Sequence, residues 1–221
     1  VAAIRWCPRR SRESHRPAQI GASLLDLGWG WFNAGEDSRA RDSMEEALRV
    51  AQATGERALI NRARIGLLQM LVAVGELDQV EPMARGALAE AERQHDLRSE
   101  HFAHHFLADC PLIAGDAAAA APRYRRALEL AHALGERTEM AIEMQGVAMA
   151  AAGTGDAQRA LVLGGAAAAE LDALGIDFSG IRFWSGLLDR YYGFARSALG
   201  DGADAAWQTG RALGFERAVA E

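Results

Sequence analysis

A glycine followed by an acidic residue returns along this chain at a fixed step of forty residues. The members of this series are Gly35-Glu36, Gly75-Glu76, Gly115-Asp116 and Gly155-Asp156. A second series of turn residues lies midway between them: Gly55, His95, Gly135 and Gly175. Self-similarity at a fixed period is typical of a repeat protein, in which neighbouring units stack to bury apolar faces that one unit cannot bury alone.

Each half of the repeat has the composition of a helix. The stretch SMEEALRVAQATG places Met44, Leu48 and Ala51 at helical spacing, with Glu45 and Arg49 on the other side. Glycine readily adopts the left-handed conformation that ends many helices, and an acid after it is favoured at the N-terminus of the next helix. The glycine-acid pairs therefore predict where one helix ends and the next begins.

This pattern predicts an all-α solenoid of about five antiparallel helix pairs. We expect a basic leader or linker at residues 1–17 and a single domain at 18–221, with units at about 18–55, 56–95, 96–135, 136–175 and 176–221. The expected helices are 18–34, 37–53, 57–74, 78–94, 97–114, 117–134, 137–153, 157–174, 181–199 and 201–212, then a short one from Phe215. Pro111 should kink or shorten the end of the fifth helix, and Pro122 should disturb the early part of the sixth.

Charge and composition exclude several classes of protein. The net charge of −6 argues against direct binding to nucleic acid, which needs clustered cations, and the one basic cluster lies in the leader. No uncharged apolar run reaches the roughly 18 residues that span a bilayer. Cys7 and Cys110 are too few for a disulfide framework. We therefore expect a cytoplasmic protein with neither nucleic acid nor membrane as a direct partner.

Within the units, large, small and turn residues recur in the order of the tetratricopeptide (TPR) motif. The first unit carries Leu24, Leu27, Gly28, Trp31, Gly35, Ala40, Met44, Ala47 and Leu48. The third carries Leu107, Ala108, Gly115, Asp116, Ala120, Tyr124, Ala127 and Leu128, and departs from the motif at Pro111. The chain resembles a TPR protein with lengthened helices. The resemblance implies a right-handed superhelix whose inner surface is lined by the first helix of each pair.

The second half carries a narrower resemblance. RALVLGGAAAAELDALGIDF (159–178) and ARSALGDGADAAWQTGRALGFERAVA (195–220) are similar to the last repeats of bacterial LuxR-type and adenylate-cyclase-linked ATPase (STAND) regulators. Those proteins join an NTPase module to a TPR region, often followed by a DNA-binding module. The resemblance implies the sensor or scaffold part of such a transcriptional regulator, with those modules as partners, or a stand-alone relative. No G-x-x-x-x-G-K-[ST] loop is present, so the ATPase activity is not carried over.

The TPR frame also predicts a partner-binding inner face. Its residues are Leu25, Trp29, Phe32, Asn33, Arg62, Gln69, Phe102, His105, Asp109, Gln145 and Met149. Aromatic anchors mixed with separated polar groups are typical of a surface that accepts a peptide or a helix. The alternative is that Trp29 and Phe32 are covered by the leader or by another domain.

One cluster has the residue types of a metal site. His101, His105 and Asp109 are four residues apart and share one stripe of a helix. Such a stripe extends over two turns, about 11 Å, which is too long for ligands of a single ion. We therefore predict no metal, no cofactor and no catalytic residue.

A non-enzymatic interaction module is the leading hypothesis. A domain that senses a small effector is the alternative, and a metal-dependent enzyme using His101 and His105 is a remote one. An oligomer is compatible with the sequence.

Overall fold

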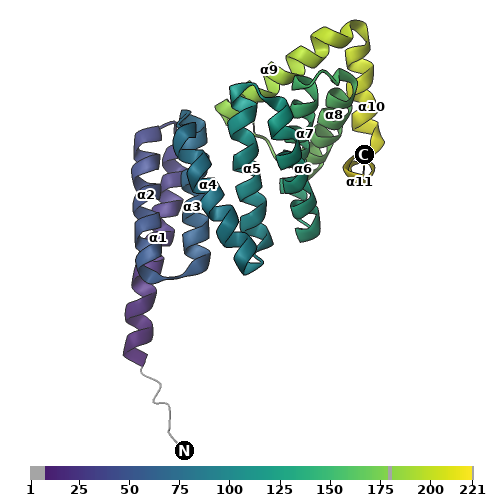
Figure 1. Cartoon of the computed structure of the whole chain (residues 1–221). Coiled ribbons are helices and arrows are strands. Elements are labelled where there is room, and N and C mark those ends of the chain that lie inside the picture. Colours follow the sequence, from purple (N-terminus) through teal and green to yellow (C-terminus); the bar gives the residue numbers. More distant parts are fainter. Residues whose placement is uncertain (1–7, 179–180, 221) are drawn as a thin grey trace, which may run out of the picture. The chain divides into compact units, whose positions relative to one another are not determined.

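The computed structural model describes residues 8–178 and 181–220, and every regular element in these ranges is helical (Figure 1). The helices are α1 (Pro8–Asn33), α2 (Asp37–Thr54), α3 (Arg57–Val74), α4 (Leu77–Gln94), α5 (Leu97–Ala114), α6 (Ala117–Leu134), α7 (Arg137–Gly153), α8 (Ala157–Leu174), α9 (Arg182–Leu199), the short 3-10 helix η1 (Gly200–Gly202), α10 (Ala203–Leu213) and α11 (Phe215–Val219). The all-α prediction is confirmed. Among these helices, none is both long and apolar enough to cross a membrane.

The chain divides into two compact units. Unit 1 ends at Glu76 and contains α1 to α3, and unit 2 begins at Leu77 and contains α4 to α11. The sequence predicted one domain from residue 18. It also predicted a leader up to residue 17, whereas α1 already begins at Pro8. The first seven residues of that leader lie outside the described residues.

The turns between helices carry the left-handed backbone that the glycines predict. Gly55, Gly75, Gly115 and Gly135 have φ angles of 69°, 80°, 90° and 70°. His95 holds the same kind of turn at φ 54°, as the one non-glycine with positive φ in the described part of the chain. Such a conformation is costly for a residue with a side chain, and histidine is among those that tolerate it better.

Aspartates after these turns act as N-caps. Asp116 accepts a hydrogen bond from the backbone N–H of Ala119 at 3.0 Å. Asp96 and Asp156 make the same bond to the N–H three residues further on. The bond satisfies one of the free N–H groups of the first helical turn. Glutamates at the same step, such as Glu36 and Glu136, make no such bond.

Prolines inside the helices do not shorten them. Pro111 lies in α5 and Pro122 in α6, and each helix has 18 residues. The shortening expected as one effect of Pro111 does not occur. Proline removes one N–H from the ladder and fixes φ near the helical value, so the bonds on either side can continue the helix.

Unit 1 is held together by small residues and a few large ones. Its core contains Leu25, Ala47, Ala51, Leu59 and Ala63, from all three helices. These side chains are 0 to 5% exposed. Alanines on α2 let its neighbours approach closely, and the apolar stripe that the sequence placed on this helix is the one it buries.

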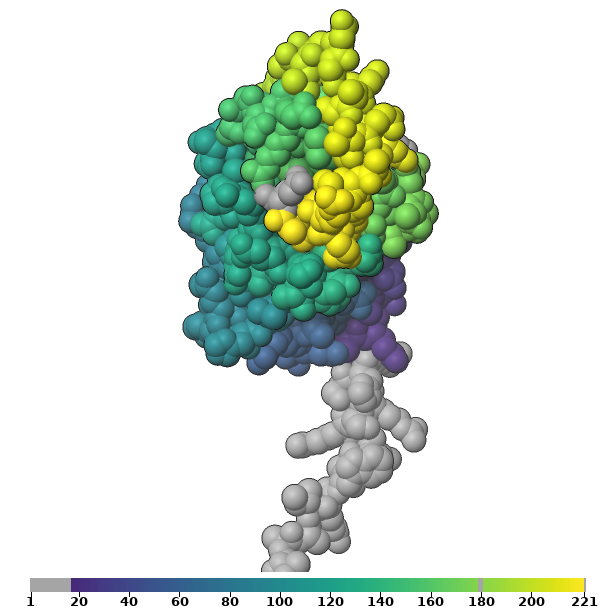
Figure 2. Space-filling model, turned by 90° about the vertical axis from the view of Figure 1, so that its right-hand side faces the viewer, coloured from purple at the N-terminus to yellow at the C-terminus, as the bar shows by residue number. Residues whose placement is uncertain are grey.

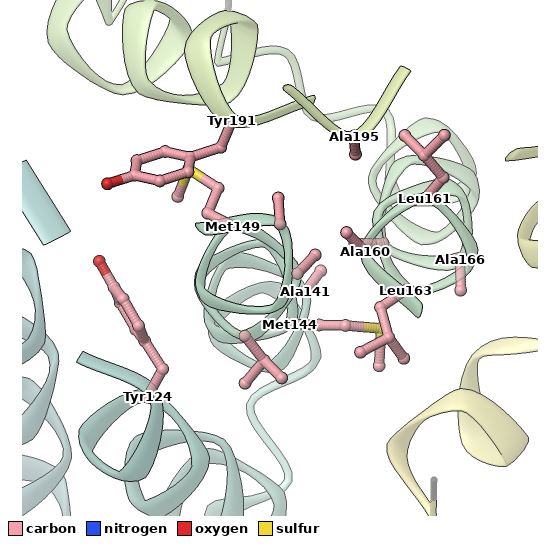
Figure 3. Close-up of a cluster of buried hydrophobic side chains, with 14 of the residues drawn as sticks. Tyr124, Ala141, Met144, Met149, Ala160, Leu161, Leu163, Ala166, Tyr191 and Ala195 are labelled. Atoms are coloured by element: carbon pink, nitrogen blue, oxygen red, sulfur yellow. The ribbon is translucent and has the colours of Figure 1, made fainter. Parts of the chain in front are cut away.

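Unit 2 has a larger core that extends to the end of the chain. Its fully buried large side chains include Tyr124, Met144, Met149, Leu161 and Tyr191. Figure 3 shows Tyr191 of α9 and Met149 of α7 pointing into the same part of this core, between the two helices. Helix α9 is therefore an integral part of unit 2.

The last helices depart from the order of the earlier ones. From α4 to α8 each helix packs against the next, but α8 then contacts α10 more extensively than it contacts α9 (Figure 2). A Cβ atom on Gly165 would lie 2.3 Å from the carbonyl oxygen of Trp207, and one on Gly210 would lie 1.9 Å from that of Val162. The α8 and α10 backbones therefore touch, while α9 also reaches α7 and α5.

Candidate functional site

A buried cluster of charged side chains joins α5 to α7. Glu143 Oε1 lies 2.8 Å from His101 Nε2 and 2.9 Å from His105 Nδ1. The three side chains are 1%, 7% and 0% exposed, in the order His101, His105 and Glu143. Residues four apart on a helix lie on one face, so both imidazoles of α5 face the same carboxylate of α7.

The cluster continues into α6 through Asp109. The Tyr124 hydroxyl donates to Asp109 Oδ1 at 2.5 Å, and Asp109 Oδ2 lies 3.5 Å from His105 Nε2. Asp109 and Tyr124 are fully buried. His105 thus stands between two carboxylates, one from α7 and one from its own helix.

This arrangement favours a charged His105. Burial alone lowers the pKa of His105, but the charges of Glu143 and Asp109 outweigh it and raise that pKa to about 10. Burial also disfavours an ionised Glu143, yet His105 and the hydrogen bonds from both imidazoles bring the Glu143 pKa below its ordinary value. Burial raises the pKa of Asp109, against the attraction of His105 and the Tyr124 bond. His105 and Glu143 form a buried ion pair.

The cluster is not completely satisfied. Glu143 Oε2 and Asp109 Oδ2 are buried and accept no hydrogen bond. A buried polar atom left without a partner costs about 1–3 kcal/mol. The network therefore fixes how α5 packs against α7, but the two unpaired oxygens lower the free energy of unfolding.

The described residues offer no metal-binding geometry around these histidines. Among the side chains that the structure describes, those of residues 17–178 and 181–220, no three or more His, Cys, Asp or Glu groups converge as ligands of one ion. His101 Nε2 and His105 Nδ1 both face a single oxygen of Glu143. The arrangement is that of a carboxylate clamped by two imidazoles.

Helix α9 lies on the faces of α5 and α7 that the TPR frame assigns to the inner surface. The indole N–H of Trp184 donates to Gln145 Oε1 at 2.8 Å, and the Trp184 ring lies 5.8 Å from the His105 ring. Further along, the Tyr191 hydroxyl donates to the carbonyl oxygen of Leu112 at 2.6 Å. We call the face formed by His105, Leu112 and Gln145 the α5–α7 wall.

The residues predicted for the partner-binding face fall into three groups by exposure. The buried ones are Leu25, His105, Asp109, Gln145 and Met149. Trp29, Phe32, Gln69 and Phe102 are half-buried, and Asn33 and Arg62 are exposed. In this conformation a partner cannot reach the buried group, which includes four of the five predicted residues of unit 2. The accessible members lie mainly in unit 1.

The accessible members of unit 1 include an aromatic pair and a charged pair. The rings of Trp29 and Phe32 meet edge to face with their centroids 5.9 Å apart. Arg62 of α3 lies 3.9 Å from Asp26 of α1, and both side chains are well exposed. Unit 1 therefore offers a half-buried aromatic pair on α1 and an exposed arginine on α3.

Sequence reasoning did not assign Glu143, Tyr124 or Trp184 to the site. Glu143 had a usable signal, because the residues forty and eighty positions earlier are Ala103 and Ala63, both buried. A glutamate at a buried repeat position indicates a partner nearby. Trp184 had no such signal, since α9 does not follow the packing order of the earlier helices.

No protein-family model matches this chain, and a comparison with curated proteins found no match either.

Proposed function

We propose that this chain is a non-enzymatic interaction module that recognises a helical segment of a protein partner. In this proposal the helix pairs form a right-handed, TPR-like superhelix with a forty-residue repeat, and the first helices of the pairs provide the binding surface. That period is supported by the left-handed turns, which lie at Gly55, Gly75, His95, Gly115, Gly135, Gly155 and Gly175.

One observation carries the proposal: unit 2 already holds a helix on its α5–α7 wall. Helix α9 buries Trp184, Leu187, Tyr191 and Ala195, which follow one another at steps of three, four and four residues. Its opposite side carries Asp189 and other exposed residues. Such a stripe of anchors is the mode in which an amphipathic helix enters a groove. The wall is therefore suited to an amphipathic helix with aromatic anchors.

We propose that the equivalent face of unit 1 is where the partner binds. Trp29, Phe32, Asn33, Arg62 and Gln69 all keep part of their surface exposed there. Tryptophan and arginine are over-represented among residues that dominate binding energy, because they offer a large contact area and several donors. The aromatic pair would take apolar anchors of the partner, and Arg62 would take an acidic side chain.

The cellular setting of the proposal follows from the sequence resemblance alone. We place the module in a cytoplasmic bacterial transcriptional regulator, where it passes a binding event to an NTPase module and a DNA-binding module. In this setting the chain itself neither hydrolyses nucleotide nor contacts DNA.

The test uses helix-forming peptides selected by display on the full chain. Their Kd is compared between the wild type, a Trp29→Ala/Arg62→Ala variant and the control Arg49→Ala, whose side chain is 71% exposed on α2. We expect at least a tenfold loss for the double variant, which corresponds to about 1.4 kcal/mol, and no change for the control. Equal binding to all three proteins would exclude the face of unit 1.

A cavity in unit 2 favours a second candidate function, the sensing of a small effector. It has a volume of about 370 Å³ and lies among α6, α7, α8 and α11. Leu128, Val147 and Leu163 give it apolar lining, and Arg125 and His132 also line it. The size is near the lower end of known ligand sites. Glu129 and Glu216 also line the cavity beside Arg125 and Arg159, so the composition suits a small amphipathic ligand that carries both a carboxylate and a cationic group. A carboxylate that raises the melting temperature of the wild type, but not of Arg125→Ala, would support this function.

A further inference from the structure

We infer that α9 is a displaceable occupant of the α5–α7 wall, and that a partner helix with the same anchor spacing takes its place. This inference rests on the proposed function and extends it, because it adds a second binding surface and specifies the partner. The competing helix needs an indole at the first anchor, a leucine three residues later and a phenol seven residues after the indole.

The anchor chemistry follows from what the wall offers. Gln145 is buried and accepts from the indole N–H of Trp184, so a partner that lacks this donor leaves a buried oxygen unpaired. The carbonyl oxygen of Leu112 accepts from the Tyr191 hydroxyl. Between these two polar contacts, the apolar side chain of Leu187 is buried. A helix with one indole and one phenol at this spacing satisfies both acceptors.

One buried polar group weakens the packing of α9 against the rest of unit 2. The Tyr192 hydroxyl is buried without a hydrogen-bond partner, and its pKa is raised by that burial. The ring of Trp207 packs edge to face against that of Tyr192, with the two centroids 5.5 Å apart. When α9 leaves, this hydroxyl regains water, so part of the cost of opening is returned.

The helix itself is also weakened from within. Gly186 and Gly193 lie inside α9, and a Cβ atom at either position would meet nothing within 4 Å. Glycine in a helix interior is less favourable than alanine because it loses more backbone freedom on folding. No close contact in the structure requires either glycine. They lower the stability of α9 without improving its packing.

Helix α10 has an attachment of its own to α8, in addition to its contacts with α9 through the exposed Arg196–Asp204 pair and the rings of Tyr192 and Trp207. Helix α10 is seated directly on α8 through the contacts of Gly165 and Gly210. Gly200 joins α9 to the following turn at φ 53° and ψ −126°, a conformation that only glycine adopts readily. Helix α9 is therefore bounded by a glycine turn and can leave the wall while α10 stays in place.

Hydrogen exchange of the full-length wild type tests whether α9 opens on its own. We expect the amides of α9 to exchange at least tenfold faster than those of α8 and α10, because α9 opens while its neighbours stay folded. Equal protection of α8, α9 and α10 would overturn the inference. This measurement needs no partner, so it can fail or succeed independently of the proposed binding to unit 1.

A competition experiment tests what the wall binds. The probe is a fluorescent peptide of residues 182–199, added to the full-length chain. Gly186→Ala/Gly193→Ala should stabilise α9 in place and weaken peptide binding at least fivefold. Trp184→Phe/Tyr191→Phe, which keeps an aromatic ring at each position and removes both donors, should strengthen it at least fivefold. The control is Gly86→Ala in α4, where a Cβ also meets nothing within 4 Å, and it should leave peptide binding unchanged.

The outcomes separate the alternatives. Weaker binding by the alanine variant of α9 but not by Gly86→Ala supports a displaceable helix. Equal peptide affinity in the wild type and both double variants means that the peptide does not use the wall, and the inference is then wrong.

Discussion

Units 1 and 2 carry different side chains at equivalent positions of the repeat. Leu25 and Trp29 of unit 1 correspond, eighty residues on, to His105 and Asp109 of unit 2. Trp29 keeps part of its ring exposed, whereas Asp109 is fully buried and bonded to Tyr124. The repeat determines where on a helix a side chain lies, but the neighbouring helices determine what surrounds it. The same position is therefore a surface in one unit and core in the other.

The two units also differ in how their helices are fixed to one another. Unit 1 uses small apolar residues such as Ala47 and Ala63, together with Leu25. Unit 2 adds the buried pair of His105 and Glu143. Removing two charges from water costs free energy that the burial of two apolar side chains does not cost. The buried ion pair therefore contributes more to a defined arrangement of the helices than to net stability. We expect unit 2 to be the more sensitive of the two to changes in charge.

The largest effect should come from Glu143→Ala. This change leaves the charged His105 buried without its main partner, and we expect the free energy of unfolding to fall by about 3–5 kcal/mol. Urea unfolding of the full chain measures it. Asp26→Ala removes the exposed partner of Arg62 in unit 1 and should change stability by less than about 0.5 kcal/mol. Similar losses in the two variants would remove the contrast between the units.

Two glycines at equivalent repeat positions allow the packing density of the two units to be compared. Gly146 of α7 and Gly66 of α3 lie eighty residues apart, but a Cβ atom would be 2.3 Å from the Tyr124 ring at Gly146 and 3.4 Å from Met44 Sδ at Gly66. We expect Gly146→Ala to destabilise by about 1–3 kcal/mol, since a buried ring must move. Gly66→Ala should be neutral or stabilising by up to about 1 kcal/mol, because alanine favours helix and methionine can adjust. Thermal unfolding of both variants measures the difference.

The ion pair predicts a loss of stability at mildly alkaline pH. The pKa of His105 rises from 6.5 to about 10 on folding, so the folded state binds its proton more tightly. The stabilisation is complete below pH 6.5 and is lost as the pH rises toward 10. Between pH 7 and 8.5 the free energy of unfolding should fall by about 2 kcal/mol.

This window lies below the ordinary pKa of Cys110, 9.0, so the thiol contributes little to the change. Urea unfolding at several pH values checks the slope, with His105→Gln as the control that should show a flatter profile. A wild-type stability that stays constant from pH 7 to 8.5 would contradict a charged His105.

The smallest effect concerns the turns. His95 adopts φ 54° where its counterpart Gly55, forty residues earlier, adopts 69°. His95→Gly should stabilise by about 1 kcal/mol, because glycine has no side chain to clash in this conformation. Gly55→Ala should destabilise by a similar amount. Melting temperatures of the two variants should therefore move in opposite directions, and a shift in the same direction would mean that the turns are not equivalent.

Most of the helix boundaries were predictable from the sequence because glycine and aspartate determine them locally. The predicted helix at 57–74 has the bounds of α3, and α5 and α6 also match at both ends. The start of α1 was missed by ten residues, since the segment from Pro8 to Pro17 has no apolar period to indicate a helix. Pro111 does not shorten α5, because the helical bonds around one missing N–H suffice to continue the helix.

The candidate site was less predictable because it depends on contacts between distant residues. His105 and Asp109 were identified as a stripe on one helix, but their main partner, Glu143, comes from another. The register of α9 on α5 and α7 is set by Trp184 and Tyr191, and nothing in a local pattern indicates which helices an aromatic stripe will meet. Periodicity gives the face of a helix that is apolar, and only the fold gives its neighbours.

Photo-crosslinking tests most directly whether these helical repeats bind an amphipathic helix on the face formed by the first helices of the pairs. A benzophenone side chain is placed in the full-length chain at Asn33, which is exposed beside Trp29 and Phe32, or at Arg49 on α2. A selected helix-forming peptide is then added at a concentration near its Kd. The account predicts strong crosslinking from position 33 and little from position 49. Equal yields from the two positions, or a yield confined to position 49, would contradict it.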